Sequence, residues 1–231
     1  MIRFRFNYFA TWDQYRFGPA LELVQALVSE VERDCAKAVA EFDASDDGYV
    51  DDSIDPEQGG QFIRVHKGLA DNAWDLDDLF RNYFPTLRRS ATLGTLCSLL
   101  EHELNDLCTT IQRHLKVRIS VTDLQGAGIE RATKYLKLVG GVDLDSNDVS
   151  WAELKKIYAL RNAFVHAGGK ASKPDVLRYV DDHANLRRSG AEIVIDEGYL
   201  SKVLLVMTEY GNVLGDGLRV RFSEDEPSGK I

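Results

Sequence analysis

The stretch "LRRSATLGTLCSLLEHELNDLCTTIQRHLKV" (87–117) decides the fold class of this chain of 231 residues. Its apolar residues recur at intervals of three and four, the spacing that places side chains on one face of an α-helix. The residues of this stripe are Leu93, Leu96, Cys97, Leu100, Leu104, Leu107, Ile111 and Leu115. The stretch therefore predicts a long helix with one buried face.

The same spacing recurs over most of the chain and predicts further helices. One long helix is expected over 17–42, with Pro19 in the first turn, where helices tolerate proline. A short helix is expected around 75–84 and is predicted to stop at Pro85. The remaining helices are expected over 128–139, 150–166 and 198–214, with an extended segment at 191–196. The predicted fold is all-α, an up-and-down bundle of four to five main helices with a short extended segment before the last helix.

This pattern divides the chain into three parts. Residues 1–74 are expected to form a long helix and an acidic loop (43–62), packed on the same domain as a helical bundle over 75–215. Residues 216–231 are predicted to be a C-terminal tail, with frayed residues from 223 onward.

Composition restricts the functional class. The net charge of −9 argues against a protein whose whole surface binds nucleic acid, although it allows a local site. No apolar run approaches the roughly 20 residues that span a bilayer, and the N-terminal stretch lacks the features of a secretory signal. The cysteines Cys35, Cys97 and Cys108 form no CxxC pair, so we expect reduced, buried thiols in a cytoplasmic protein. No membrane partner is expected.

The acidic stretch "DASDDGYVDDSI" (43–54) resembles a calcium-binding loop in part. Position 12 of such a loop is a glutamate that binds the ion with both oxygens, and here it is Ile54. A solvated acidic loop is therefore the favoured interpretation, and no metal or other cofactor is expected.

The candidate chemistry lies in "SWAELKKIYALRNAFVHAGG" (150–169). Ser150 and Glu153 fit a capping box at the start of the helix, and Gly168 and Gly169 fit the left-handed turn that ends it. No nucleophile elbow, HExxH motif or metal cluster accompanies this stretch.

On a helical wheel, Arg161 falls near the middle of the apolar face, and Asn162 and His166 lie together at its edge. A guanidinium in an apolar face is costly unless it is paired or reaches a wet cleft. Two interpretations remain open. Arg161 forms a structural ion pair, with Glu101 as the preferred partner, or Arg161 and His166 face a cleft that binds a negative charge. His114 and His183 are expected to be surface or edge residues.

The run Arg161-Asn162-Ala163-Phe164-Val165-His166 resembles the Arg-x4-6-His motif at the end of the last core helix in HEPN domains. The spacing of Glu101, Asn105 and Cys108 is similar to that in the long second helix of larger members. The resemblance covers about 75–215 and implies a bundle of four to five helices.

The resemblance also implies a function. Active members are metal-independent endoribonucleases, often toxins or antiviral effectors, and commonly homodimers in which two motifs share one cleft. Carried over, His166 acts as general base and acid at the ribose 2′-hydroxyl, since imidazole changes charge near neutral pH. Arg161 stabilises the charge that develops on the phosphorus, Asn162 orients His166 or the phosphate, and Glu101 completes the candidate set.

RNA is the substrate that the resemblance implies, and an antitoxin or a defence-system protein is the partner. In members silenced by transfer of AMP, a tyrosine stands at the position of Gly168, so that control has no acceptor here. Other members are inactive binding modules, and a catalytically inactive dimeric module is the alternative.

Overall fold

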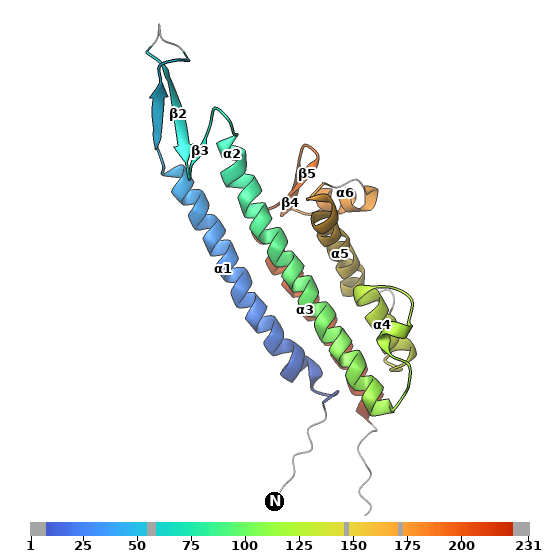
Figure 1. Ribbon diagram of the computed structural model, residues 1–231. Coiled ribbons are helices and arrows are strands. Elements are labelled where there is room, and N and C mark those ends of the chain that lie inside the picture. The colour runs from blue at the N-terminus through green and yellow to red at the C-terminus, as the bar shows by residue number, and fades with distance from the viewer. Residues whose placement is uncertain (1–7, 55–58, 146–147, 171–172, 224–231) are drawn as a thin grey trace, which may run out of the picture.

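The computed structural model describes residues 8–54, 59–145, 148–170 and 173–223. These residues are mostly helical and also form two small antiparallel sheets (Figure 1). The expected predominance of helices is confirmed, but the prediction of an all-α fold with one short extended segment is wrong, because the described residues form two sheets. Among the described residues, no helix combines the length and the hydropathy needed to cross a membrane.

Two long helices, α1 (Gly18–Asp43) and α3 (Phe84–Leu115), lie side by side (Figure 1). The final helix, α7 (Tyr199–Phe222), packs against both. The stripe predicted for the stretch 87–117 is buried in this core, except that Leu115 is half-buried. The three cysteines are buried and free, as expected.

Two shorter helices pack on α3 and complete the bundle. They are α4 (Gly128–Leu138), which follows the 3-10 turn η4 (Val121–Asp123), and α5 (Val149–Ala167), which also contacts α7. Buried hydrophobic residues of α1, α3, α4, α5 and α7 form one main core, and Phe42 at the end of α1 belongs to a second, smaller cluster with Leu76 and Phe80. The N-terminal helix therefore shares its core with the rest of the bundle.

Pro85 does not stop the short helix before it. Helix α2 (Leu76–Asp78) continues through a π-helical turn, η3 (Leu79–Tyr83), directly into α3. In this turn the Phe84 N–H donates to the carbonyl of Leu79, five residues back. Because the hydrogen-bond ladder changes its step just before the proline, the missing N–H of Pro85 falls in the first turn of α3. The predicted break at Pro85 is wrong.

The same arrangement precedes Pro19. The π-helical turn η1 (Asp13–Phe17) leads into α1, and the Gly18 N–H donates to the carbonyl of Asp13. The two longest helices of the N-terminal half therefore begin in the same way, each with a proline in the first α-helical turn.

The acidic segment 43–62, predicted as a loop, contributes residues 48–51 and 61–62 to strands, and its residues 55–58 lie outside the described residues. Strand β1 (Gly48–Asp51) pairs with β2 (Gln61–His66), and β2 pairs with the short β3 (Leu69–Ala70). The hairpin projects beyond the end of α1 (Figure 1). Its base is held because Ile63 and His66 are buried, and the His66 ring packs against Phe42 at 5.2 Å. Such long-range packing leaves no local signal in an acidic sequence.

The segment between α5 and α7 contains helix α6 (Pro174–Asp181) and a second hairpin, β4 (Leu186–Ser189) and β5 (Glu192–Ile195). The extended segment predicted at 191–196 is confirmed as β5, whereas β4 and α6 were not predicted. The Ile193 N–H donates to the Gly169 carbonyl at 3.0 Å, which ties this hairpin to the end of α5.

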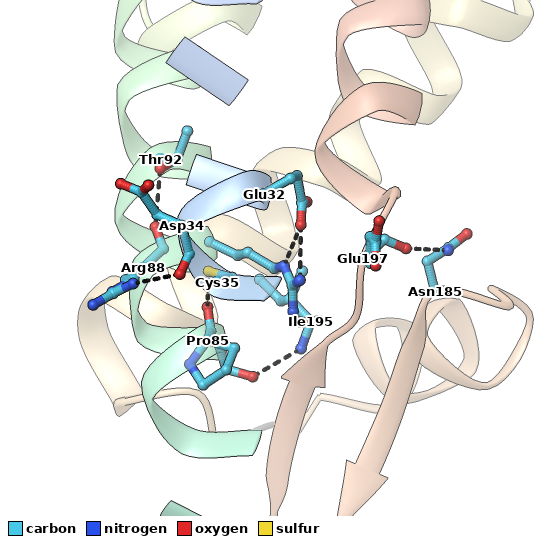
Figure 2. A network of polar contacts seen from close by, with 11 residues as sticks. Glu32, Asp34, Cys35, Pro85, Arg88, Thr92, Asn185, Ile195 and Glu197 are labelled. Carbon is cyan, nitrogen blue, oxygen red and sulfur yellow. Dashed lines mark hydrogen bonds and ion pairs between the residues drawn. The ribbon is translucent and has the colours of Figure 1, made fainter. Parts of the chain in front are cut away.

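A buried ion pair joins three of these elements (Figure 2). Arg89 on α3 donates to the Glu32 carboxylate on α1 from Nε at 2.9 Å and from Nη2 at 2.7 Å. Its third bond, from Nη1, reaches the Ile195 carbonyl on β5 at 3.0 Å. The charge is paired and its donors are used, so Arg89 fixes the relative position of α1, α3 and β5.

Helix α7 continues beyond the expected start of the tail. Phe222 at its end is buried, and Arg219 pairs with Asp13 at 2.9 Å. Residues 216–222 of the predicted tail are therefore helical, and residues 224–231 lie outside the described residues.

Candidate functional site

Helix α5 carries the Arg161–His166 motif, and its start differs from the prediction. Asp148 is the N-cap and accepts a hydrogen bond from the Trp151 N–H at 2.9 Å. Ser150 lies inside the first turn and bonds Asp148, so the predicted capping box of Ser150 with Glu153 is wrong. Aspartate is as good an N-cap as serine, and here it stands closer to the helix start.

The end of α5 matches the prediction. Gly168 adopts a left-handed conformation with φ of 59°, and the Gly169 N–H donates to the Ala163 carbonyl at 3.2 Å. The Gly168 N–H donates to the same carbonyl, so the two glycines together satisfy a carbonyl that the helix leaves open. The turn fixes where α5 stops and places His166 in its last turn.

A cleft of about 680 Å³ opens beside α5, α4 and α3. Arg161, Asn162 and His166 of α5 all line it, together with Glu101 of α3. The four candidate residues predicted from the sequence thus face one cavity, although Arg161 and His166 are five positions apart on one helix.

Arg161 is half-buried, and among the described residues its side chain makes one hydrogen bond, from Nη1 to the Asn162 Oδ1 at 3.0 Å. Its Nε is buried and has no partner among the described residues. Within the described part of the chain, Arg161 forms no ion pair with Glu101 or any other carboxylate. The structural ion pair considered for Arg161 is thus not what the described residues show.

Glu101 packs against the start of α4 instead of pairing with Arg161. A Cβ on Gly128 would lie 2.9 Å from the Glu101 Oε1, and Gly128 has φ of 52°. A side chain at this position would be strained and would displace the carboxylate, so glycine keeps Glu101 at the cleft.

The charges of Arg161 and Glu101 both affect the pKa of the buried Cys97 thiol. Burial raises the pKa of Cys97 to about 12, while Arg161 lowers it and Glu101 raises it. The guanidinium and the carboxylate therefore act in opposite directions on the same buried thiol, although both side chains line the cleft. The Tyr158 hydroxyl donates to the Cys97 carbonyl at 2.6 Å and holds α5 against α3 there.

The cleft is positively charged, in contrast to the chain as a whole. Its lining contains the cationic side chains Lys155, Arg161, Lys170 and Lys173. Only Glu101 and Glu130 oppose them in the lining, while the chain carries a net charge of −9. A concave surface with such an excess of one sign concentrates ligands of the opposite sign.

The three lysines of the cleft were not predicted as site residues. Lys155 has a sequence signal, since it lies seven residues before Asn162 and eleven before His166 on the same helix face. Lys170 and Lys173 follow the helix and reach the cleft only through the turn at Gly168 and Gly169. No helical period could have placed them there.

The other two histidines considered in the sequence have structural surroundings. His183 is half-buried, with Nδ1 at 2.9 Å from the Tyr179 carbonyl and Nε2 at 3.1 Å from Glu153 Oε1. His114 is exposed and packs edge-on against Phe9 and Phe222. His183 thus connects α6 with α5, a role that the expectation of a surface or edge residue missed.

Comparison of the chain with models of protein families, with curated proteins and with solved structures finds no match. The cleft and its side chains are therefore the features from which a function can be inferred.

Proposed function

We propose that the protein is a metal-independent endoribonuclease of toxin or phage-defence type, acting on RNA in the cytoplasm. The observation that carries the proposal is the cleft itself. Arg161, Asn162 and His166 line one cavity with a cationic excess in an otherwise acidic chain. A positive site of this kind favours a phosphodiester, and the histidine supplies the acid–base group that cleavage needs.

The chemistry requires one proton transfer at each end of the reaction. His166 removes the proton of the ribose 2′-hydroxyl, whose oxygen then bonds to the phosphorus. The bond between phosphorus and the 5′-oxygen breaks, and this oxygen receives the proton that protonated His166 gives up. The products are a 2′,3′-cyclic phosphate and a 5′-hydroxyl end.

The guanidinium of Arg161 is free to stabilise the negative charge that develops on the phosphate during cleavage. Its hydrogen bond to Asn162 fixes one nitrogen of the guanidinium and leaves Nε without a partner among the described residues. An unsatisfied buried donor costs about 1–3 kcal/mol, and an anion against the guanidinium offsets that cost. We assign to Asn162 the role of holding the Arg161 guanidinium in place through their hydrogen bond. Glu101 is assigned a supporting role as a carboxylate in the lining of the same cleft.

A homodimer is part of the proposal. Val165, beside His166 on α5, is 57% exposed. Tyr83 at the end of η3 and Leu87 in the first turn of α3 are 47% and 53% exposed. A shallow pocket connects Tyr83 and Leu87 to Phe164 at the end of α5. Burying this apolar surface in a symmetric contact would bring two copies of the motif together. Light scattering should then give twice the 26.0 kDa of the chain. A toxin or defence enzyme also implies an antitoxin or a defence-system partner.

The second candidate is a catalytically inactive HEPN-like dimeric module that binds or regulates. One observation favours it: His166 is exposed and forms no hydrogen bond with any described residue that would orient its ring. A catalytic histidine is usually oriented by a third group. RNA binding without cleavage would select this candidate.

The decisive experiment measures RNA cleavage by purified protein in the presence of EDTA. We expect His166→Ala to slow cleavage by about 10²–10⁴-fold and Arg161→Ala by about 10²–10³-fold. His102→Ala is the matched control, because His102 is exposed on α3 and does not line the cleft. Equal cleavage by wild type and His166→Ala would overturn the assignment.

A further inference from the structure

A second, smaller pocket of about 260 Å³ adjoins the cleft and shares Glu130 with it. Trp151, in the first turn of α5, forms one wall and is half-buried. Its indole stacks on the buried ring of Tyr210, with centroids 5.7 Å apart and planes inclined by 30°. Tyr210 is held in turn by a hydrogen bond between its hydroxyl and that of Thr133, at 2.8 Å. The pocket thus has a supported aromatic wall.

The pocket and the cleft lie along the same face of α5. Trp151, Lys155, Asn162 and His166 are spaced by four, seven and four residues, and this spacing puts them in one stripe. The stripe is about 22 Å long at 1.5 Å per residue. A ligand that follows α5 from the cleft toward its N-terminus therefore passes Lys155 and arrives at Trp151.

The charges of the two cavities differ. Around the pocket, Lys134 and Lys137 stand against the carboxylates of Glu130, Asp145 and Asp148, without the cationic excess of the cleft. The remaining lining is largely apolar, with Leu138, Leu144 and Val213. A phosphate is thus favoured in the cleft and disfavoured in the pocket. A neutral, planar group fits the pocket, and the Nζ of Lys155, a residue of the cleft lining, lies over the Trp151 ring at 5.8 Å from its centroid.

We propose that this pocket binds an unpaired base of an RNA strand, stacked on Trp151, while the backbone follows Lys155 to the cleft. The identity of the ligand as RNA rests on the proposed function. The base must be unpaired, because the face of a base in a duplex is covered by its neighbours. Stacking on an aromatic ring tolerates any base, so the pocket selects single strands and not a sequence.

The test uses a protein that cannot cleave its ligand. In the His166→Ala background, the affinity for a fluorescent single-stranded RNA is measured by anisotropy, with and without Trp151→Ala. Loss of one base stack should weaken binding by about 5- to 150-fold. Trp151→Phe, which keeps an aromatic ring against Tyr210, should retain most of the affinity. Trp74→Ala is the matched control, because Trp74 is 53% exposed and lines neither cavity.

An abasic scan of the RNA tests the same contact without relying on the fold of a variant. One abasic position should weaken binding to the His166→Ala protein by the factor that Trp151→Ala causes, and should have no further effect on the double variant. Equal binding of all single abasic RNAs, or unchanged affinity of the Trp151→Ala protein, overturns the proposal. A peptide or a duplex that depends on Trp151 as strongly as the single strand does also overturns it.

The outcomes separate this inference from the proposed function. Trp151-dependent RNA binding without any cleavage by the wild type rejects the nuclease and keeps the base pocket. Cleavage that requires His166, together with binding that ignores Trp151, rejects only the base pocket.

Discussion

The Arg161 side chain donates from Nη1 to the Oδ1 of Asn162, its neighbour on α5, across 3.0 Å, and forms no other hydrogen bond to a described residue. Adjacent residues on a helix point in directions about 100° apart, so the contact requires the arginine to fold back along the helix surface. The contact gives a structural reason for an asparagine at position 162, directly after the arginine. It steadies a half-buried guanidinium at the edge of a cationic cleft.

The stability of two arginine variants should differ sharply. Arg89→Ala removes one partner of the buried pair with Glu32 and should cost about 3–5 kcal/mol of unfolding free energy. Arg161→Ala breaks no ion pair among the described residues and should cost less than about 1 kcal/mol. Urea unfolding of both variants and the wild type measures the difference. A large loss for Arg161→Ala would restore the structural ion pair as the explanation for this residue.

RNA binding should depend on salt through the lysines of the cleft. For a single strand, the logarithm of the binding constant falls with the logarithm of salt concentration by about 0.7 for each phosphate contact. Lys170→Gln and Lys173→Gln should each reduce that slope by about 0.7. Lys37→Gln on α1, an exposed residue that pairs with Glu41, serves as the control. Identical slopes for all the variants would place the phosphate backbone elsewhere.

Alkaline pH should destabilise the fold. Burial raises the pKa of Cys97 and Cys108 from 9.0 to about 12, and burial also raises the pKa of Tyr158, Tyr179, Tyr199 and Tyr210 above 10.0. These groups lose protons at lower pH in the unfolded chain than in the folded one. The unfolded state therefore binds fewer protons above pH 9, and stability falls as the pH rises from 9 toward 12.

Unfolding free energies measured between pH 7 and pH 11 check this dependence. Below pH 8, the titration of these groups should leave the unfolding free energy nearly constant. Above pH 9, the unfolding free energy should decrease steadily. The double variant Cys97→Ala and Cys108→Ala should show a shallower decrease, since two of the groups are removed. A free energy of unfolding that stays constant up to pH 11 contradicts the burial of these side chains.

The parts of the fold that were predictable from sequence are those fixed by local spacing. The stripe from Leu93 to Ile111 and the glycine turn after α5 follow from helical geometry and backbone conformation alone. The continuation of the helix through Pro85 was not predictable in this way, because it depends on a π-helical turn before the proline. The partner of Arg89 lies 57 residues away, and a separation of that size has no period to detect.

In the candidate site too, local spacing predicted some features, and others depend on residues outside one helix. The wheel identified Arg161 as a residue that an apolar face cannot accommodate alone, and the structure places it at a cleft. A wheel treats one helix in isolation, so it could not show that the start of α4, at Gly128, lines the same cleft as Arg161. Nor could it locate Lys170 and Lys173, whose positions depend on the turn after the helix.

The most direct measurement of the central claim uses an RNA oligonucleotide with a single 2′-deoxynucleotide at a mapped cleavage position. If the 2′-hydroxyl is the nucleophile activated by His166, cleavage in EDTA stops at that position and continues at unmodified ones. The unmodified product should carry a 2′,3′-cyclic phosphate, visible as a mass 18 Da below that of the linear phosphate. Undiminished cleavage at the deoxy position, or a product with a free 3′-hydroxyl, would contradict the account.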